Sequence, residues 1–371
     1  TLPTGAVPGD AVLWHGTVSH FDYTINPADN LTLTAYNGPD AVSIPDTIGG
    51  LPVVEVGVNA FQNQTTLTSV TLPDSVTTIG DYGFAGCTGL TAITIPDSVT
   101  VIGSHAFDGC SGLTAIDLGS GVTSIGFAAF SGCTSLTAVT IPDSVISLAG
   151  NAFFNCTGLT AVSLGSGISQ IAPATFQGTG LTSLVIPDTV TEIGNFAFFG
   201  CGDLSEVILG SGVTTIGQGA FQECPSLNSV TLPAGVTSLG PFAFAAGDTM
   251  NDIYFPGDAP ATDPNTFDGQ DSLEIFHLPG GSGWTNPWSG QPTAPWNPEA
   301  ASLGLSGGDF GFTVTGSGDF RCVVEGSDDL VEWTAIDTIT LSGGTATFTD
   351  PDTSSYTQRF YRFRIPGTQS E

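Results

Sequence analysis

The chain has 371 residues, of which 4 are Lys or Arg and 35 are Asp or Glu, so its formal net charge at pH 7 is −31. All four basic residues are arginines, and the first of them is Arg321. This charge excludes a nucleic-acid-binding protein and argues against contact with an anionic membrane, because both need clustered Lys and Arg. No apolar run approaches the roughly 20 residues of a membrane-spanning helix. The acidity favours solubility, or suits surroundings rich in cations.

The first 30 residues precede any regular pattern. Residues 1–10 are typical of a linker or a free arm, and residues 17–25 predict an edge strand. We therefore expect residues 1–30 to form an N-terminal arm and cap strand. Such an arm could pair with the open strand edge of a neighbour. The chain begins with Thr1, not Met, and we interpret it as a mature chain from which an export signal has been removed.

From residue 31 the chain is periodic. A phenylalanine returns every 23 residues, with one interval of 22, at Phe61, Phe84, Phe107, Phe130, Phe153, Phe176, Phe198, Phe221, Phe244 and Phe267. A fixed period of this length predicts a solenoid, in which each repeat is one coil stacked on the next.

Within each repeat, apolar residues alternate with turn residues. In the repeat that begins at Leu90, a short strand carries Ile93 and Ile95, and the segment Pro96-Asp97 then turns the chain. A second apolar pair and the anchor Phe107 follow. We expect residues 31–280 to form about ten such coils, spaced about 4.8 Å apart, which bury their apolar residues only when they are stacked.

The repeat motif resembles a known family. Leu67-Thr-Ser-Val-Thr-Leu-Pro-Asp-Ser-Val-Thr-Thr-Ile-Gly and Phe84-Ala-Gly-Cys87 are similar to the BspA-like leucine-rich repeats of bacterial surface proteins, as is the opening segment 46–55. The resemblance covers roughly residues 31–296. It implies a right-handed, β-rich leucine-rich-repeat solenoid of parallel strands with short helical turns. Residues 281–298 resemble the cap of such solenoids, with Trp284, Trp288 and Trp296 over the last coil.

Six cysteines each follow an anchor phenylalanine by three residues: Cys87, Cys110, Cys133, Cys156, Cys201 and Cys224. Stacked neighbours could form a disulfide, but parallel side chains pair poorly. We expect buried free thiols that act as small hydrophobes, and no metal site, because a linear ladder does not converge on an ion.

An aspartate follows the turn proline in some coils, at Asp46, Asp74, Asp97, Asp143 and Asp188. The intervening coils carry Gly-Ser, as at Gly119-Ser120. The alternation has two explanations, turn preference and the separation of like charges. A row of Ca²⁺ ions is a third, but its carboxylates are too sparse for about six to eight oxygens per ion. We therefore expect no cofactor.

The first strand of each coil exposes its second, third and fifth residues, which in most coils are Thr, Ser or Ala. This face lacks the aromatic residues and arginines of typical binding hot spots. The later coils differ, and there we place the candidate binding residues: Glu206, Ile208, Asp252, Tyr254, Glu274, Ile275 and His277. The alternative is that these coils are simply degenerate near the cap.

Residues 299–371 break the period and predict a small antiparallel β-sandwich. Expected strands are 310–315, 320–325, 345–349 and 359–365. Arg362 and Arg364 share one strand face, so they form either local ion pairs, to Glu325 or Glu332, or, together with Arg359, a cationic patch that docks on an acidic solenoid. Cys322 is expected in the core.

No catalytic motif is present in the sequence, and His15, His20, His105 and His277 form no pattern typical of an active site or a zinc site. We therefore predict a non-catalytic extracellular or cell-surface bacterial protein whose solenoid face binds a protein or a glycan, as the resemblance implies. The alternative is a structural subunit that assembles with copies of itself into a filament or surface layer.

Overall fold

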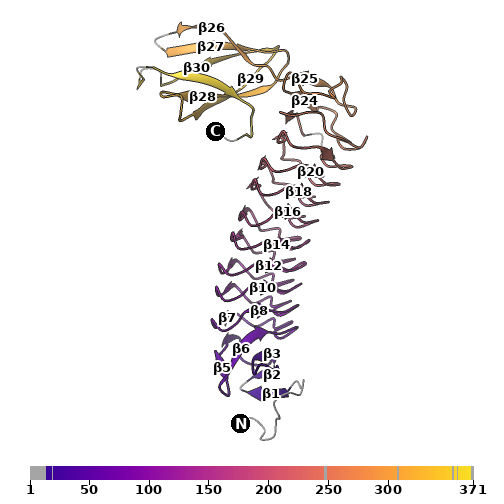
Figure 1. Ribbon diagram of the computed structural model, residues 1–371, viewed down its shortest axis with the longest axis vertical. Helices are drawn as coiled ribbons and strands as arrows, with labels where there is room; N and C mark the ends of the chain where they lie inside the picture. The colour runs from indigo at the N-terminus through magenta and orange to yellow at the C-terminus, as the bar shows by residue number, and fades with distance from the viewer. Residues whose placement is uncertain are drawn as a thin grey trace.

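The molecule is a tall solenoid with a small module at its C-terminal end, bent to one side (Figure 1). The computed structural model describes residues 14–18, 20–245, 249–306, 309–352, 355–356 and 358–368. The free arm expected at residues 1–10 lies outside these residues. The predicted fold class, a leucine-rich-repeat β-solenoid followed by antiparallel sheets, is confirmed.

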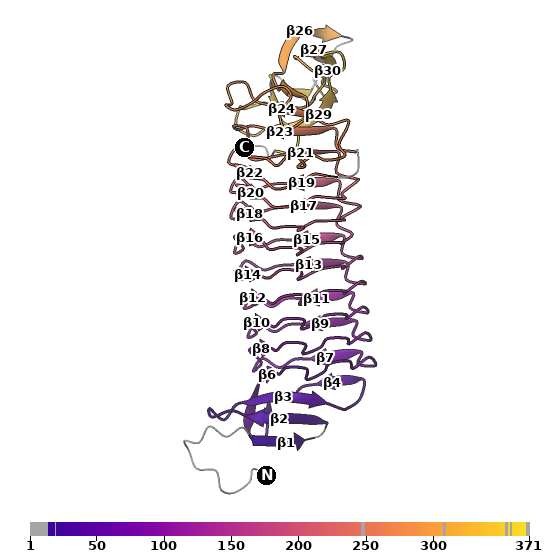
Figure 2. The same ribbon diagram turned by 90° about the vertical axis from the view of Figure 1, so that its right-hand side faces the viewer.

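Each coil contributes two short strands, and equivalent strands stack in two separate columns (Figure 2). Pairing is parallel and in register, so that Ile93 lies beside Ile116. The first column contains β4 (Ala41–Ser43), β7 (Ser69–Thr71), β9 (Ala92–Thr94), β11 (Ala115–Asp117), β13 (Ala138–Thr140), β15 (Ala161–Ser163), β17 (Ser183–Val185), β19 (Glu206–Ile208), β21 (Ser229–Thr231), β23 (Asp252–Phe255), β24 (Glu274–His277) and β25 (Thr293–Pro295).

The second column begins at an antiparallel N-terminal cap. β1 (Trp14–Val18), β2 (Phe21–Ile25) and β3 (Leu31–Tyr36) pair in this order, and β3 continues into the parallel column. β5 (Thr47–Ile48) forms a hairpin with β6. The column itself contains β6 (Leu51–Val56), β8 (Thr78–Ile79), β10 (Val101–Ile102), β12 (Ser124–Ile125), β14 (Ser147–Leu148), β16 (Gln170–Ile171), β18 (Glu192–Ile193), β20 (Thr215–Ile216) and β22 (Ser238–Leu239).

The third side of each coil is a turn segment. The short helical turns expected here are not α-helices in the described residues, because most segments contain two residues with a positive φ, such as 55° at His105 and 72° at Gly109. A left-handed residue breaks the helical pattern and directs the next N–H groups along the solenoid axis. The amide of Phe107 consequently donates to the carbonyl of Ala129 in the next coil, at 2.7 Å. The turn side is therefore a third hydrogen-bonded ladder.

The anchor phenylalanines form one continuous stack inside the solenoid. Phe130 is fully buried, and its ring lies 5.2 Å from that of Phe107 and 5.3 Å from that of Phe153, with interplanar angles of 7° and 9°. Each ring in the stack contacts the rings of the coils on both sides, so each coil is stabilised by both of its neighbours.

The cysteines are free and buried, as the sequence predicts. They also have a role that the sequence did not indicate, because each of the six donates its thiol hydrogen to the carbonyl of the anchor residue one coil earlier. Cys110 Sγ lies 3.1 Å from the Phe84 carbonyl oxygen. In the coil of Phe267 the equivalent residue is Gln270, and its Nε2 donates to the Phe244 carbonyl at 3.0 Å. The position therefore requires a hydrogen-bond donor more than it requires sulfur.

The alternating Asp and Gly-Ser turns are bonded to each other across coils. Asp97 Oδ1 accepts hydrogen bonds from Ser120 N at 2.7 Å and from Ser120 Oγ at 2.9 Å. A Cβ atom on Gly119 would lie 2.6 Å from the carbonyl oxygen of Pro96, so only glycine lets the upper turn approach this closely. We call this contact the Asp–Ser clamp; it recurs at Asp143–Ser166 and Asp188–Ser211. It adds a direct reason for the alternation to the two that sequence suggested.

The C-terminal module consists of two three-stranded antiparallel sheets with a shared core. One sheet contains β26 (Glu299–Ser306), β27 (Asp309–Thr315) and β30 (Thr345–Thr349), and the other contains β28 (Arg321–Ser327), β29 (Thr334–Thr340) and β31 (Phe360–Arg364). The sequence pattern missed β26 and β29. β26 is rich in Ala, Ser and Gly, which are weak strand formers, and most of the side chains of β29 are exposed.

Candidate ligand-binding face

The outward face of the first column is flat and composed of small side chains. Thr91, Ala92 and Thr94 are all exposed, as are the equivalent residues of the neighbouring coils, and this agrees with the sequence pattern. Between them, Ile93 points into the core. The alternation of strand side chains thus presents hydroxyl and methyl groups to solvent over the length of the open column.

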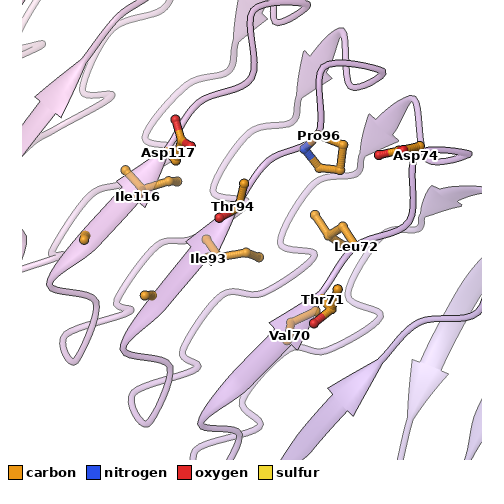
Figure 3. Close-up of a pocket in the computed structure, with 11 residues that line it drawn as sticks. Val70, Thr71, Leu72, Asp74, Ile93, Thr94, Pro96, Ile116 and Asp117 are labelled. Carbon is orange, nitrogen blue, oxygen red and sulfur yellow. The ribbon is translucent and has the colours of Figure 1, made fainter.

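A shallow depression of about 490 Å³ crosses this face over β7, β9 and β11. Figure 3 shows its residues: Thr71, Thr94 and Asp117 stand at corresponding positions of neighbouring strands, with Asp74 and Pro96 at the turns. Ala92 and Ala115 lie beside each other in register, and beneath their small side chains the buried Ile93 and the half-buried Ile116 also line the depression. The depression offers an apolar floor, hydroxyl groups and two carboxylates, but no basic group.

The first column is open along most of its length, and its C-terminal end is covered by the module. Tyr254 and Phe276 point outward from β23 and β24, yet both belong to the core of the module and are at most 1% exposed. The Tyr254 hydroxyl accepts a hydrogen bond from the Arg321 amide at 2.9 Å. Arg321 Nη1 also donates to Ser229 Oγ at 3.1 Å. The module therefore docks on the outward face of β21–β25.

Two of the candidate acids lie at this junction. Burial raises the pKa of Asp252, although the nearby Arg321 charge opposes the shift. Burial also raises the pKa of Glu274, and the charges of Asp252 and Asp319 add to this effect. Both side chains are half-buried. Because Asp252 and Tyr254 contact the module of the same chain, this end of the column is first of all an intramolecular contact.

In the last full coil, the strand register predicted from the sequence is wrong by one residue. β23 and β24 are offset by 22 residues, since Asp252 pairs with Glu274, whereas the anchor phenylalanines are offset by 23. A shift of one residue exchanges the two faces of a strand. Ile275, expected on the outward face, is therefore buried in the solenoid core, and Phe276 takes its place. The ring of His277 stacks on that of Trp284 in the cap, at 4.9 Å and 5°.

The last open strand before the module is β19. Glu206 is exposed there, and Ile208 is half-buried. Ile208 lines a second depression, of about 420 Å³, between the first column and the C-terminal residues Gly367 and Thr368. The Thr231 hydroxyl donates to the Pro366 carbonyl and holds this segment against β21. The structure thus places the seven candidate residues in one region, but only Glu206 is fully exposed.

The comparisons with known proteins agree with this geometry. The family model described as BspA type Leucine rich repeat region matches in six copies, over residues 54–181 and 169–283, which is more than half of the chain. The chain belongs to the BspA-type leucine-rich-repeat family.

Solved structures similar to this BspA-type chain are also bacterial leucine-rich-repeat proteins. A leucine-rich repeat protein from Bacteroides ovatus is 27% identical, with a TM-score of 0.63 over 71% of this chain and 70% of that chain. A leucine rich cell surface protein from Faecalibacterium prausnitzii is 29% identical, with a TM-score of 0.52 over 71% of this chain and 88% of that chain. The search among curated proteins found no match.

Three of the four arginines of the BspA-type chain are held in ion pairs within the module. Glu325, fully buried, accepts hydrogen bonds from Arg362 Nε and Arg364 Nε, both at 2.7 Å. Arg359 Nη1 lies 2.7 Å from Asp350 Oδ2, and that carboxylate is also fully buried. The sequence offered local ion pairs or a docking patch, and in the structure these three arginines form local ion pairs. Removal of the arginines that pair with a carboxylate should therefore destabilise the module, because an unpaired buried carboxylate is strongly destabilising.

The cap tryptophans divide between two roles. Trp288 closes the solenoid core, with its ring 5.5 Å from Phe255 and 6.0 Å from Phe267, and Trp284 packs beside it. Trp296, expected over the last coil, instead belongs to the core of the module, and its Nε1 donates to the Arg321 carbonyl at 3.0 Å. It faces the module because it follows β25, which is the last strand of the column.

Neither a metal centre nor a membrane-crossing helix is found in the part of the chain that the structure describes. No group of three or more His, Cys, Asp or Glu residues there is arranged to hold a metal ion. No helix there has the length and the apolar character needed to cross a membrane. The depression over β7–β11 was missed from the sequence, although the alanines at 92 and 115 were a usable signal for a hollow between larger neighbours.

Proposed function

We propose that this BspA-type protein is a non-catalytic bacterial surface protein whose open first-column face binds a protein or glycan ligand without a cofactor. The observation that supports the proposal is the contrast along this column. From β4 to β19 the outward face is free, hollowed over β7–β11 and rich in hydroxyl groups, whereas from β21 onward the module covers it. A flat array of hydroxyl groups with the carboxylates of Asp74 and Asp117 suits a ligand rich in hydrogen-bond donors, such as a sugar chain or a basic peptide.

The similarity to a cell-surface protein of Faecalibacterium prausnitzii supports an extracellular location. Self-assembly, the alternative, would leave the same face available for contacts between copies. The arginine-bearing tail no longer supports it, because Arg359, Arg362 and Arg364 are paired inside the module.

The proposal is tested by substitutions that fill the depression over β7–β11. The double variant Ala92→Arg/Ala115→Arg places two long charged side chains over it, and both positions are exposed, so the fold is retained. The matched control, Thr191→Arg/Thr214→Arg, adds the same charge at exposed positions beside the second column. Both are compared with the unmodified protein on an array of glycans and an array of purified secreted proteins. The proposal expects a ligand that the first variant loses and the control keeps.

Ligands that bind both variants equally, or an array without any ligand, would contradict the proposal. Filaments or sheets that form at rising protein concentration, and that Ala92→Arg/Ala115→Arg abolishes, would replace it with self-assembly.

A further inference from the structure

A second surface of the solenoid carries an apolar patch. In the described residues of the solenoid, six large apolar side chains are exposed, and five of them fall on five consecutive coils, one on each. They are Val58, Tyr82, Val101, Phe127 and Ile146, with exposed fractions of 56%, 37%, 37%, 48% and 71%. We call these five residues the second-column patch.

The patch lies on a different side from the open face of the first column. Each of its residues falls within the seven positions before the anchor phenylalanine of its coil, where β8, β10, β12 and β14 form the second column (Figure 2). Four steps between coils of about 4.8 Å give the patch a length of about 19 Å. Val58, Tyr82 and Phe127 lie two or three residues before their anchors, and Val101 and Ile146 lie six or seven residues before theirs. Exposed apolar side chains gathered on one side of a protein mark an interaction site more often than single exposed residues do.

The centre of the patch is ordered by contacts between side chains. The ring of Tyr82 stacks on that of His105 at 4.7 Å and 2°, and Phe127 meets the other side of His105 at 5.6 Å and 65°. His105 Nδ1 lies 2.9 Å from Asp108 Oδ2, which fixes the imidazole. Rings held in this way lose little side-chain entropy when a partner binds.

The fold does not need these side chains. The residue equivalent to Tyr82 is Asn59 in the preceding coil, and the residue equivalent to Phe127 is Ser104 in the coil before it. Tyr82 also has a φ of 57°, a conformation that asparagine adopts more readily than tyrosine. An exposed aromatic residue at a strained position is better explained by a contact with a partner than by stability of the coil.

The charges around the patch define the partner. Glu55, Asp81 and Asp108 lie on the same coils, and no Lys or Arg occurs before Arg321. No Lys or Arg side chain of the same coils therefore balances these carboxylates, and they favour a partner that carries its own positive charge. Aromatic rings beside carboxylates attract Lys and Arg, and the module shows the same chemistry, with the Arg359 guanidinium 4.0 Å from the Tyr356 ring centre.

We propose that the second-column patch binds a protein surface that combines apolar residues with Lys or Arg. This site is independent of the ligand of the first column. Its apolar centre provides the affinity, and the carboxylates at its rim attract the partner and select its charge.

The experiment uses three fluorescent 12-residue peptides as probes, with alternating Leu-Lys, Leu-Glu and Ser-Lys sequences. Binding is measured by fluorescence anisotropy. The patch variant is Tyr82→Asn/Phe127→Ser/Ile146→Thr, in which each new residue is the one that a neighbouring coil carries at that position, namely Asn59, Ser104 and Thr123. The control is Val185→Thr, which removes the sixth exposed apolar side chain, on β17 of the first column.

We expect the full-length protein to bind the Leu-Lys peptide at least about tenfold more tightly than either other peptide, because both the apolar and the cationic contacts are needed. The patch variant loses this preference, while Val185→Thr and both melting temperatures stay unchanged. Equal binding of the Leu-Lys and Ser-Lys peptides, equal binding to the patch variant, or no binding of the Leu-Lys peptide would overturn the proposal. So would a patch-dependent dimer in analytical ultracentrifugation, which would assign the surface to a second copy of the chain.

Discussion

Docking of the C-terminal module depends on Tyr254, and replacing this residue provides the sharpest test of the structure. The side chain is 1% exposed, its ring lies 5.3 Å from that of Phe276, and its hydroxyl accepts the Arg321 amide. Tyr254→Phe keeps the ring and leaves the amide without this acceptor, which destabilises the docked state by about 1–3 kcal/mol. Tyr254→Ala also removes the ring, and a buried aromatic replaced by alanine costs about 3–5 kcal/mol.

The two variants are compared by hydrogen exchange of the module amides and by urea unfolding. We expect exchange in β28 and β31 to accelerate in the order wild type, Tyr254→Phe, Tyr254→Ala, while exchange in β9 and β11 stays unchanged because those coils lie far along the solenoid. Tyr82→Ala, at an exposed tyrosine of the same chain, serves as the control. If the alanine variant at 254 has the exchange rates and the urea midpoint of the wild type, the module does not dock through this residue.

Three further predictions concern the solenoid and the buried thiols. Phe130→Ala removes a fully buried ring from the stack and should lower the free energy of unfolding by about 3–5 kcal/mol in urea titrations; a loss below about 1 kcal/mol would contradict a continuous core. Ser120→Ala removes one donor from Asp97, whose pKa is held below its ordinary value of 3.8 mainly by the Ser120 amide, and the pKa measured by NMR should rise towards 3.8. A carboxylate whose pKa is lowered on folding stabilises the folded state above the unfolded pKa. The stabilisation by Asp97 is therefore present above about pH 4 and is lost as the pH falls below 3.8. An unchanged pKa of Asp97 in the variant would exclude the hydroxyl contact. Burial raises the pKa of the Cys322 thiol to about 12. All seven cysteines are buried, so a thiol reagent at pH 8 should label none of them until the protein unfolds, and rapid labelling of native protein would refute their burial.

The sequence predicted those parts of the fold that repeat. Period, strand faces and buried thiols follow from local pattern, because each coil contacts only its neighbours and the same environment recurs. The prediction failed where a contact depends on residues far apart in the chain. Tyr254 was assigned to an open face, since nothing in its own coil shows that residues 320–324 will cover it. The register of Ile275 was wrong because a loop shortened by one residue is not visible in the spacing of the phenylalanines.

The candidate sites show the same division. That the first-column face is small, flat and neutral could be predicted strand by strand. The depression over Ile93 and Ile116, and the second-column patch around His105, arise only when neighbouring coils are considered together. Similarly, the aspartate turns were explained from single coils, whereas the structure shows that Asp97 bonds to Ser120 of the next coil.

The Asp–Ser clamp has a consequence for how such a chain can change its length. Loss of any one coil between those of Asp97 and Ser211 would set two aspartate turns, or two Gly-Ser turns, directly against each other, and a clamp would be lost. Loss or duplication of two coils, such as the 46 residues from Leu90 to Ser135, leaves every remaining clamp with a partner. Coils can therefore be gained or lost in pairs without breaking a clamp. Related chains that differ in length should differ by even numbers of coils within the clamped region.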